Sequence, residues 1–396
     1  MDIKTNCLLK CRGVCVGAVG IIDPDGEVIV MVVKAGSVFL DSKFKQCDIR
    51  ITNGFVTEIG ESLYPATAEA VYDAGGCYVI PGLFDIHMHG AVDEDFSDGS
   101  PEGLLRIAEY ERSCGITSFC PTTMSIGRDE LLKVFRTGKD VAERCPQIYG
   151  FHMEGPFINP EKKGAHNEGY IVLPDMKLFQ ECFEASGKRI QKLTLAPEMD
   201  GALEMMRDLK DKVCISLGHT NADYFCASIA FSEGTGQVTH LYNGMTEFGH
   251  RNPGIIGAAF DKKEVFVELI ADGVHVHDSM IRATFSMFDG RVVLVSDSMR
   301  ATGLDDGEYS LGGQSVRVNG KKAVLADGTI AGSVTNLFDC MKYCIEIGIP
   351  VEKAVAAATL TPAKALGAEE QIGMIAVGRK ADIVIVDDKF RLLKVF

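Results

Sequence analysis

The stretch YVIPGLFDIHMHG, residues Tyr78–Gly90, is a short apolar strand that leads into two histidines, His87 and His89. Side chains of a β-strand alternate between its two faces, so histidines two positions apart point to the same side and can bind one divalent ion. This spacing alone is a weak signal. However, all nine histidines lie between His87 and His277, and most of them follow an apolar run. The pattern indicates a metal site assembled from several strand ends, and hence an enzyme.

Apolar runs that end in a polar residue divide the middle of the chain, with helical patterns such as Glu102–Cys114 and Gly201–Asp211 between most of them. Eight strand–helix repeats in roughly 250 residues predict an α/β fold of the TIM type, a (β/α)8 barrel, with catalytic groups at the carboxyl ends of its strands. A doubly wound sheet is the alternative, but it would need a glycine-rich phosphate loop that the sequence lacks. The eight runs are Leu83–His89, Thr117–Thr122, Ile148–Glu154, Leu193–Glu198, Val213–His219, Val238–Asn243, Val265–Asp272 and Val292–Asp297.

Both ends of the chain have a different, β-rich pattern. Val32–Gly36 and Asp48–Gly60 are predicted strands, the second of them folded into a hairpin at Asn53-Gly54. Near the other end, Gly373–Asp387 is a turn followed by a strongly apolar strand. The two ends therefore predict one small β-sandwich domain built from both termini.

The predicted boundaries follow from these patterns. Residues 31–80 and 373–396 form the small β domain, and residues 81–372 form the barrel. Residues 1–30 are an N-terminal extension, which we expect to be dispensable for folding and activity, with Met31 as the natural start.

Composition narrows the class of protein. A hydrophobic content of 46% in 396 residues supports a full core, and a net charge of −15 argues against non-specific nucleic-acid binding. No apolar stretch reaches the roughly 20 residues that a transmembrane helix needs. The thirteen cysteines show no C-x-x-C spacing and are typical of buried, reduced thiols. We therefore expect a cytoplasmic protein.

Three polar residues that end predicted strands are candidate metal ligands: Glu154, His219 and His240. A carboxylate at the end of an apolar strand is costly to bury without a partner, which is either a metal ion or a lysine or arginine. Together the three residues give a His₂Glu set with one coordination position open for water, as in catalytic zinc sites. His152 lies two residues before Glu154 and is interpreted as a core or outer-sphere histidine.

Asp297 ends the eighth predicted strand, which would close the barrel beside the first strand and its histidines. A carboxylate beside a metal-activated water can take up its proton and later pass it to a leaving group. The alternative interpretation is an aspartate that caps a following helix.

The order and spacing of the motifs together resemble the N-acetylglucosamine-6-phosphate deacetylases, a family of the amidohydrolase superfamily, from about Met31 to the end of the chain. The motifs are His87-x-His89, Glu154-Gly155-Pro156, Gly164-Ala165-His166, Gly218-His219-Thr220, Thr239–Asn243, Arg251-Asn252-Pro253-Gly254, Ala271–His275 and Ser296-Asp297.

The resemblance implies a set of ligands for one or two divalent ions per subunit. Glu154, His219 and His240 would hold the main ion, and His87 and His89 would hold a second or a shared one. Zinc is the first choice of metal, and iron, manganese or cobalt are the alternatives.

The resemblance also implies how a sugar phosphate is bound and hydrolysed. Asp297 would be the base and acid, and His166 would help the metal to polarise the acetamide carbonyl. Arg251 would reach the phosphate in the neighbouring subunit, which implies a homodimer. The implied substrate-binding residues are Ala165, His166, Asn243, Gly244 (through its backbone), Arg251 and His275. His250 and His277 are expected to be solvent-exposed loop residues.

Two other functions compete with this interpretation. Dihydroorotase-like or dipeptidase-like amidohydrolases commonly use a carboxylated lysine, but here Glu154 stands at the third strand and no lysine ends a predicted strand. A catalytically silent sugar-phosphate-binding regulator would be expected to have lost Asp297 or a ligand, and all of them are present.

Overall fold

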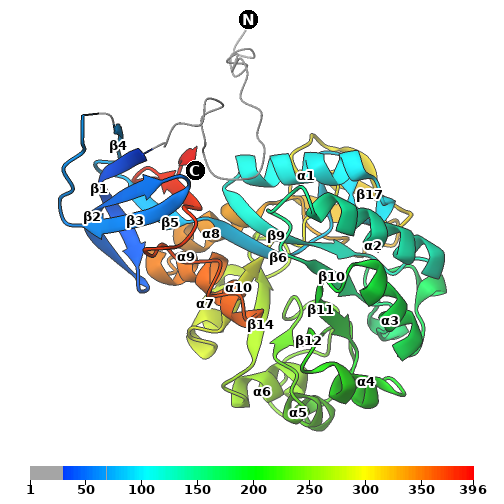
Figure 1. Ribbon diagram of the computed structural model, residues 1–396. Coiled ribbons are helices and arrows are strands. Elements are labelled where there is room, and N and C mark those ends of the chain that lie inside the picture. The colour runs from blue at the N-terminus through cyan, green and yellow to red at the C-terminus, as the bar shows by residue number, and fades with distance from the viewer. Residues whose placement is uncertain (1–29, 68) are drawn as a thin grey trace, which may run out of the picture.

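The computed structural model describes residues 30–67 and 69–396 (Figure 1). The predicted N-terminal extension lies outside the described residues, except for Val30. A β-rich unit that contains the C-terminus lies beside a larger unit of alternating strands and helices (Figure 1). Among the described helices, none has the length and apolar character to cross a membrane.

The larger unit is built on eight parallel strands, which follow one another in chain order around the sheet. Each of the eight predicted runs overlaps one of these strands, so the predicted (β/α)8 barrel is confirmed. The strands are β6 (Leu83–Met88), β9 (Ile116–Thr123), β10 (Phe151–Glu154), β11 (Ile190–Leu195), β12 (Cys214–Leu217), β13 (Gln237–Val238), β14 (Phe266–Ile270) and β15 (Val292–Val295).

Two kinds of contact close the barrel between β15 and β6. One is hydrogen bonding to the buried side chain of Asp85, and the other is backbone hydrogen bonding near the ends of the two strands. The Asp85 carboxylate accepts the backbone N–H of His87 at 3.1 Å and that of Ser296 at 3.3 Å. Burial raises the pKa of Asp85 to about 6, although these hydrogen bonds oppose the shift. Beyond this seam, the N–H of Asp297 donates to the His87 carbonyl at 2.9 Å. Closure therefore brings Asp297 beside His87 of β6 and beside His89, which follows that strand, as predicted.

Several strands end earlier than the sequence predicts. His219, His240 and Asp297 lie in the turns beyond their strands, with φ values of 49°, 29° and 47°. Such left-handed backbone is unusual for residues other than glycine and is found at functional sites. It turns these three side chains out of the sheet and into the mouth of the barrel. Thr239–Asn243 are therefore loop residues, which corrects the predicted sixth strand.

Helices follow the strands around the barrel. Their first residues carry ordinary start signals; in α1, for example, the Ser100 hydroxyl accepts the N–H of Gly103 and Pro101 occupies the first turn. The helices are α1 (Pro101–Ser113), α2 (Arg128–Ala142), α3 (Met176–Ala185), α4 (Ala202–Leu209), α5 (Tyr224–Ser232), α6 (Gly254–Asp261), α7 (Asp278–Met287), α8 (Leu337–Glu346), α9 (Val351–Ala358) and α10 (Leu360–Ala365), with short 3₁₀ turns η1 (Phe96–Asp98), η2 (Pro160–Lys162) and η3 (Glu168–Tyr170) and a small ribbon of β7 (Gly90–Ala91) and β8 (Glu94–Asp95).

Strands from both chain ends share one seven-stranded sheet, in the order β20-β19-β5-β1-β2-β3 with β4 beside β1 (Figure 1). A bridge between Phe55 and Lys380 joins β3 to the segment before β19, so the sheet folds back around its own apolar core. The predicted hairpin at Asn53-Gly54 is confirmed. The division at residues 80/81 and 372/373 stays a prediction. The strands are β1 (Val30–Leu40), β2 (Lys43–Thr52), β3 (Phe55–Gly60), β4 (Ala70–Asp73), β5 (Tyr78–Pro81), β19 (Ile383–Val386) and β20 (Leu392–Val395).

A small antiparallel sheet follows the last barrel strand and was not predicted from the sequence. It consists of β16 (Gly307–Leu311), β17 (Gln314–Asn319) and β18 (Lys322–Val324). Leu311 packs in one apolar cluster with Met124 and Ala165, and the Gln314 amide donates to the Ala165 carbonyl. The sheet is thereby attached to the loops at the mouth of the barrel.

Candidate metal centre

The three ligands predicted at strand ends meet at one point. His240 Nε2 lies 3.0 Å from His219 Nε2, and these two nitrogens lie 3.2 Å and 3.3 Å from Glu154 Oε1. Ligands bound at about 2.0–2.2 Å around a tetrahedral ion are about 3.3–3.6 Å apart. The described neighbours that form ion pairs with Glu154 are histidines, so the alternative of a salt bridge to lysine or arginine is wrong.

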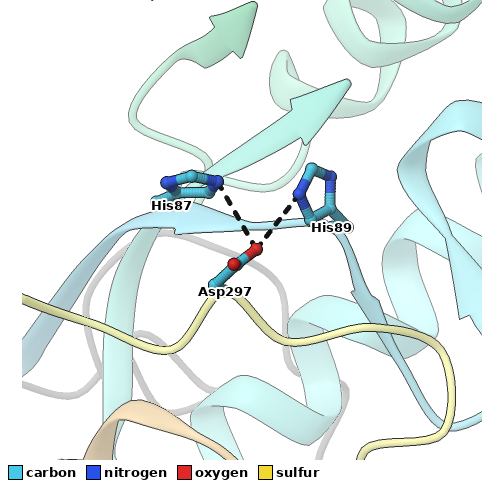
Figure 2. Close-up of side chains that lie close together, drawn as sticks. All are labelled: His87, His89 and Asp297. Atoms are coloured by element: carbon cyan, nitrogen blue, oxygen red, sulfur yellow. Dashed lines mark ion pairs between the residues drawn. The ribbon is translucent and has the colours of Figure 1, made fainter. Parts of the chain in front are cut away.

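A second potential ligand set comprises His87, His89 and Asp297 (Figure 2). Nε2 of His89 lies 3.2 Å from Asp297 Oδ1, and Nε2 of His87 lies 3.5 Å from the same oxygen. Glu154 joins the two sets, because its Oε2 lies 3.4 Å from His87 and 3.2 Å from His89 while Oε1 faces the first set. One carboxylate could therefore bridge two ions.

Each of the four histidines in the two potential ligand sets turns its Nδ1 away from the centre, toward an acceptor. His89, His219 and His240 pair with backbone carbonyls at 3.2, 2.8 and 3.0 Å, and His87 pairs with a carboxylate of Glu268 at 2.9 Å. Such partners hold a proton on Nδ1 and leave Nε2 as the nitrogen that can bind an ion, as is usual for metal-binding histidines.

The donor atoms suit a divalent ion. His87 Nε2 is completely buried and has no hydrogen-bond partner among the described residues, although it faces two carboxylates. Burial alone would lower the pKa of His87, but Glu154 and Asp297 raise it to about 9, so a metal ion bound at Nε2 would replace a proton there. Imidazole nitrogens and carboxylate oxygens around an otherwise unpaired donor are ligands that zinc accepts. The residues therefore fit the ion that the sequence predicts.

Asp297 is held as a carboxylate. Burial would raise its pKa, but the charge on His87 and the contacts of His89 outweigh burial and lower it. Its carbonyl accepts the N–H of Ser333 at 2.7 Å, which fixes the loop. The next element in the chain is β16, so Asp297 caps no helix and that alternative is wrong.

His166 is set as an uncharged donor. Its Nδ1 accepts the backbone N–H of Ser125 at 3.0 Å, so the proton is on Nε2, which lies 3.4 Å from Glu154 Oε2. Burial lowers the pKa of His166 to about 4 despite the opposing Glu154 contact. A neutral imidazole N–H beside the centre can donate to a developing oxyanion.

A cavity of about 250 Å³ opens beside both ligand sets. Five of the six predicted substrate-binding residues line it: Ala165, His166, Asn243, Gly244 and His275. The sixth, Arg251, is exposed on the surface and does not line the cavity of its own chain.

Other histidines lie where the sequence predicts. His152 is buried beneath the centre, with its ring centroid 4.5 Å from that of His87, whereas His250 and His277 are exposed. Sequence reasoning missed Lys192 and Glu268, which are buried inside the barrel below the ligands. The sequence signal that could have identified them is a charged residue inside an otherwise apolar strand.

Two potential metal-ligand sets at the carboxyl edge of a parallel barrel are typical of metal-dependent hydrolases, and the family model of the amidohydrolase family matches residues 78–396. An N-acetylglucosamine-6-phosphate deacetylase of Bacillus subtilis is 38% identical over 317 residues, covering 78% of this chain and 80% of the relative. An N-acetylgalactosamine-6-phosphate deacetylase of Escherichia coli O157:H7 is 32% identical over 324 residues, 80% of this chain and 85% of the relative.

A solved structure agrees with these relatives. The N-acetylglucosamine-6-phosphate deacetylase from Pasteurella multocida superposes with a TM-score of 0.89 at 25% identity, covering 93% of this chain and 98% of that chain. The chain therefore belongs to the N-acetylglucosamine-6-phosphate deacetylases of the amidohydrolase family, which confirms the resemblance seen in the sequence.

Proposed function

We propose that the protein hydrolyses the acetamide of N-acetyl-D-glucosamine 6-phosphate to D-glucosamine 6-phosphate and acetate, in amino-sugar catabolism in the cytoplasm. The observation that carries this proposal is the meeting of both ligand sets on Glu154 beside a cavity lined by His166 and His275. The names of the relatives supply the substrate.

The catalytic roles follow from the protonation states. A divalent ion in this centre would acidify a water molecule and polarise the acetamide carbonyl. Asp297, held as a carboxylate, accepts the proton of the attacking water and then donates it to the departing amine. His166 donates its Nε2–H to the carbonyl oxygen as negative charge develops there. The metal ligands are Glu154, His219, His240, His87 and His89.

Zinc is the ion that we propose, with one or two bound per subunit. Buried histidine and carboxylate side chains that converge within binding distance of one another favour it. Iron, manganese and cobalt accept the same donor types, so elemental analysis of the purified protein decides between them.

The phosphate is proposed to lie at the end of the cavity formed by Asn243, Gly244 and His275. Asp272 holds the imidazole of His275 at 2.8 Å and, although burial opposes it, raises the pKa of that imidazole. A cationic His275 suits a sugar phosphate, which carries about two negative charges.

Arg251 is proposed to complete the phosphate site of a second subunit in a homodimer. It stands three residues before α6, and exposed apolar side chains occur on the same stretch and on the adjacent α5: Phe248 is 43%, Phe225 74% and Ile229 51% exposed. Exposed apolar side chains of this kind are common at interfaces between subunits.

Arg251→Ala is expected to raise the KM for the phosphorylated sugar about 10- to 100-fold, the effect of one lost charge-assisted hydrogen bond. Activity on unphosphorylated N-acetylglucosamine should change little. Steady-state kinetics on both sugars checks this, with Arg207→Ala, an exposed arginine of α4, as the control. An equal loss on both sugars would remove Arg251 from the phosphate site.

The overall proposal is tested by acetate release from N-acetylglucosamine 6-phosphate, with zinc added or chelated, and with the galactosamine isomer as comparator. We expect metal-dependent acetate release. Binding of the sugar phosphate without hydrolysis under every metal condition would favour the silent regulator instead. Hydrolysis of a different amide alone would favour another amidohydrolase.

A further inference from the structure

A buried ion pair lies inside the barrel beneath the metal ligands. It joins Lys192 of β11 to Glu268 of β14, and both side chains are 0% exposed. The interior of a TIM barrel is ordinarily filled by apolar, branched side chains, and removing two charges from water carries a large desolvation cost. Apolar packing therefore does not account for a charged pair at this position.

The second carboxylate oxygen of Glu268 contacts residues of the candidate metal centre. Its Oε2 lies 2.9 Å from Nδ1 of His87 and 3.4 Å from the backbone nitrogen of His240. Because a carboxylate only accepts hydrogen bonds, His87 carries a proton on Nδ1, and Nε2 is the nitrogen that can bind an ion. Nε2 of His87 is the buried nitrogen that faces Glu154 and Asp297 and has no hydrogen-bond partner among the described residues.

His87 differs in this respect from the other histidine ligands. His89, His219 and His240 give their Nδ1 protons to backbone carbonyls, whose positions the fold fixes. A glutamate side chain has rotatable bonds and must itself be held in place. Lys192 holds it by pairing with Oε1, the oxygen that His87 does not use.

We propose that Lys192 and Glu268 are positioning residues, which fix the orientation and tautomer of His87 and thereby determine the binding of a second ion by His87 and His89. This inference rests on the proposed role of His87 as a ligand. The first ion, held by Glu154, His219 and His240, depends much less on the pair.

Glu268→Gln tests the proposal, with zinc stoichiometry and affinity measured by equilibrium dialysis and elemental analysis. The wild type should bind two ions per chain. The variant should keep the first ion and bind the second about 10- to 100-fold more weakly, the usual effect of losing an outer-sphere partner. Adding Glu268→Gln to His87→Asn should cause no further loss, because the glutamate acts through the histidine.

A second variant covers the case in which a single change impairs folding. Lys192→Met with Glu268→Leu removes both charges and leaves neither buried alone, and it should also bind one ion tightly. Glu111→Gln is the matched control, because Glu111 is a fully buried carboxyl whose oxygens have no hydrogen-bond partner among the described residues. It should bind both ions.

Three results would overturn the proposal: a wild type that binds one ion at saturating zinc, a Glu268→Gln protein with normal affinity for the second ion, or additive losses with His87→Asn. Each is separable from failure of the proposed function, because ion binding is measured without substrate. A one-ion protein that still releases acetate would refute the positioning role alone.

Discussion

Asp297→Asn is expected to keep the ion of the Glu154, His219 and His240 set and to lose nearly all turnover, by about 10³- to 10⁴-fold in kcat. The reason is that an amide cannot accept the proton of the attacking water, and positioned acid–base groups contribute about 10²- to 10⁴-fold. The substitution preserves shape and an oxygen at Oδ1, which faces His87 and His89. The loss should therefore arise in chemistry rather than in folding.

Metal content and kinetics on the same sample check this prediction. The KM should change little, because the phosphate end of the cavity at His275 is untouched. Asp305→Asn, an exposed aspartate in the loop before β16, is the matched control and should be fully active. Substantial activity in Asp297→Asn would mean that another group carries the proton.

The barrel and the convergence of the candidate metal ligands could be predicted from the sequence because they depend on local pattern. His87 and His89 share a strand face by alternation, and the carboxyl ends of parallel strands meet at one edge of the barrel. That is why Glu154, His219 and His240 could be grouped although up to 86 residues separate them. The substrate-binding residues and the role of His166 were inferred from the resemblance to a family.

The rest depends on contacts that no local pattern encodes. Strand ends were misplaced at His240 because a positive φ, which sequence does not reveal in a non-glycine residue, ends the strand early. Lys192 and Glu268 are each conspicuous inside an apolar strand, but their pairing arises only when the barrel brings β11 and β14 into one interior. The His219 imidazole is anchored by the backbone carbonyl of Lys162, and a backbone acceptor can belong to any residue type, so the sequence does not reveal it.

The sharpest test of a shared centre is Glu154→Ala, for which we expect loss of both ions and activity at background. Both of its oxygens lie within 3.4 Å of imidazole nitrogens from the two sets, so its removal takes away a negative charge common to both. Losing an outer-sphere partner costs about 10- to 100-fold in metal affinity, and loss of a direct, bridging ligand should cost more.

Elemental analysis and circular dichroism together separate this effect from misfolding. The variant should retain its fold, since the missing carboxylate leaves histidines that can remain neutral, and Glu184→Ala, an exposed residue of α3, should bind metal as the wild type does. If Glu154→Ala lost one ion only, the carboxylate would serve a single set. If it kept both ions at wild-type affinity, the converging side chains would not be the metal centre, and the proposed hydrolysis would need a different site.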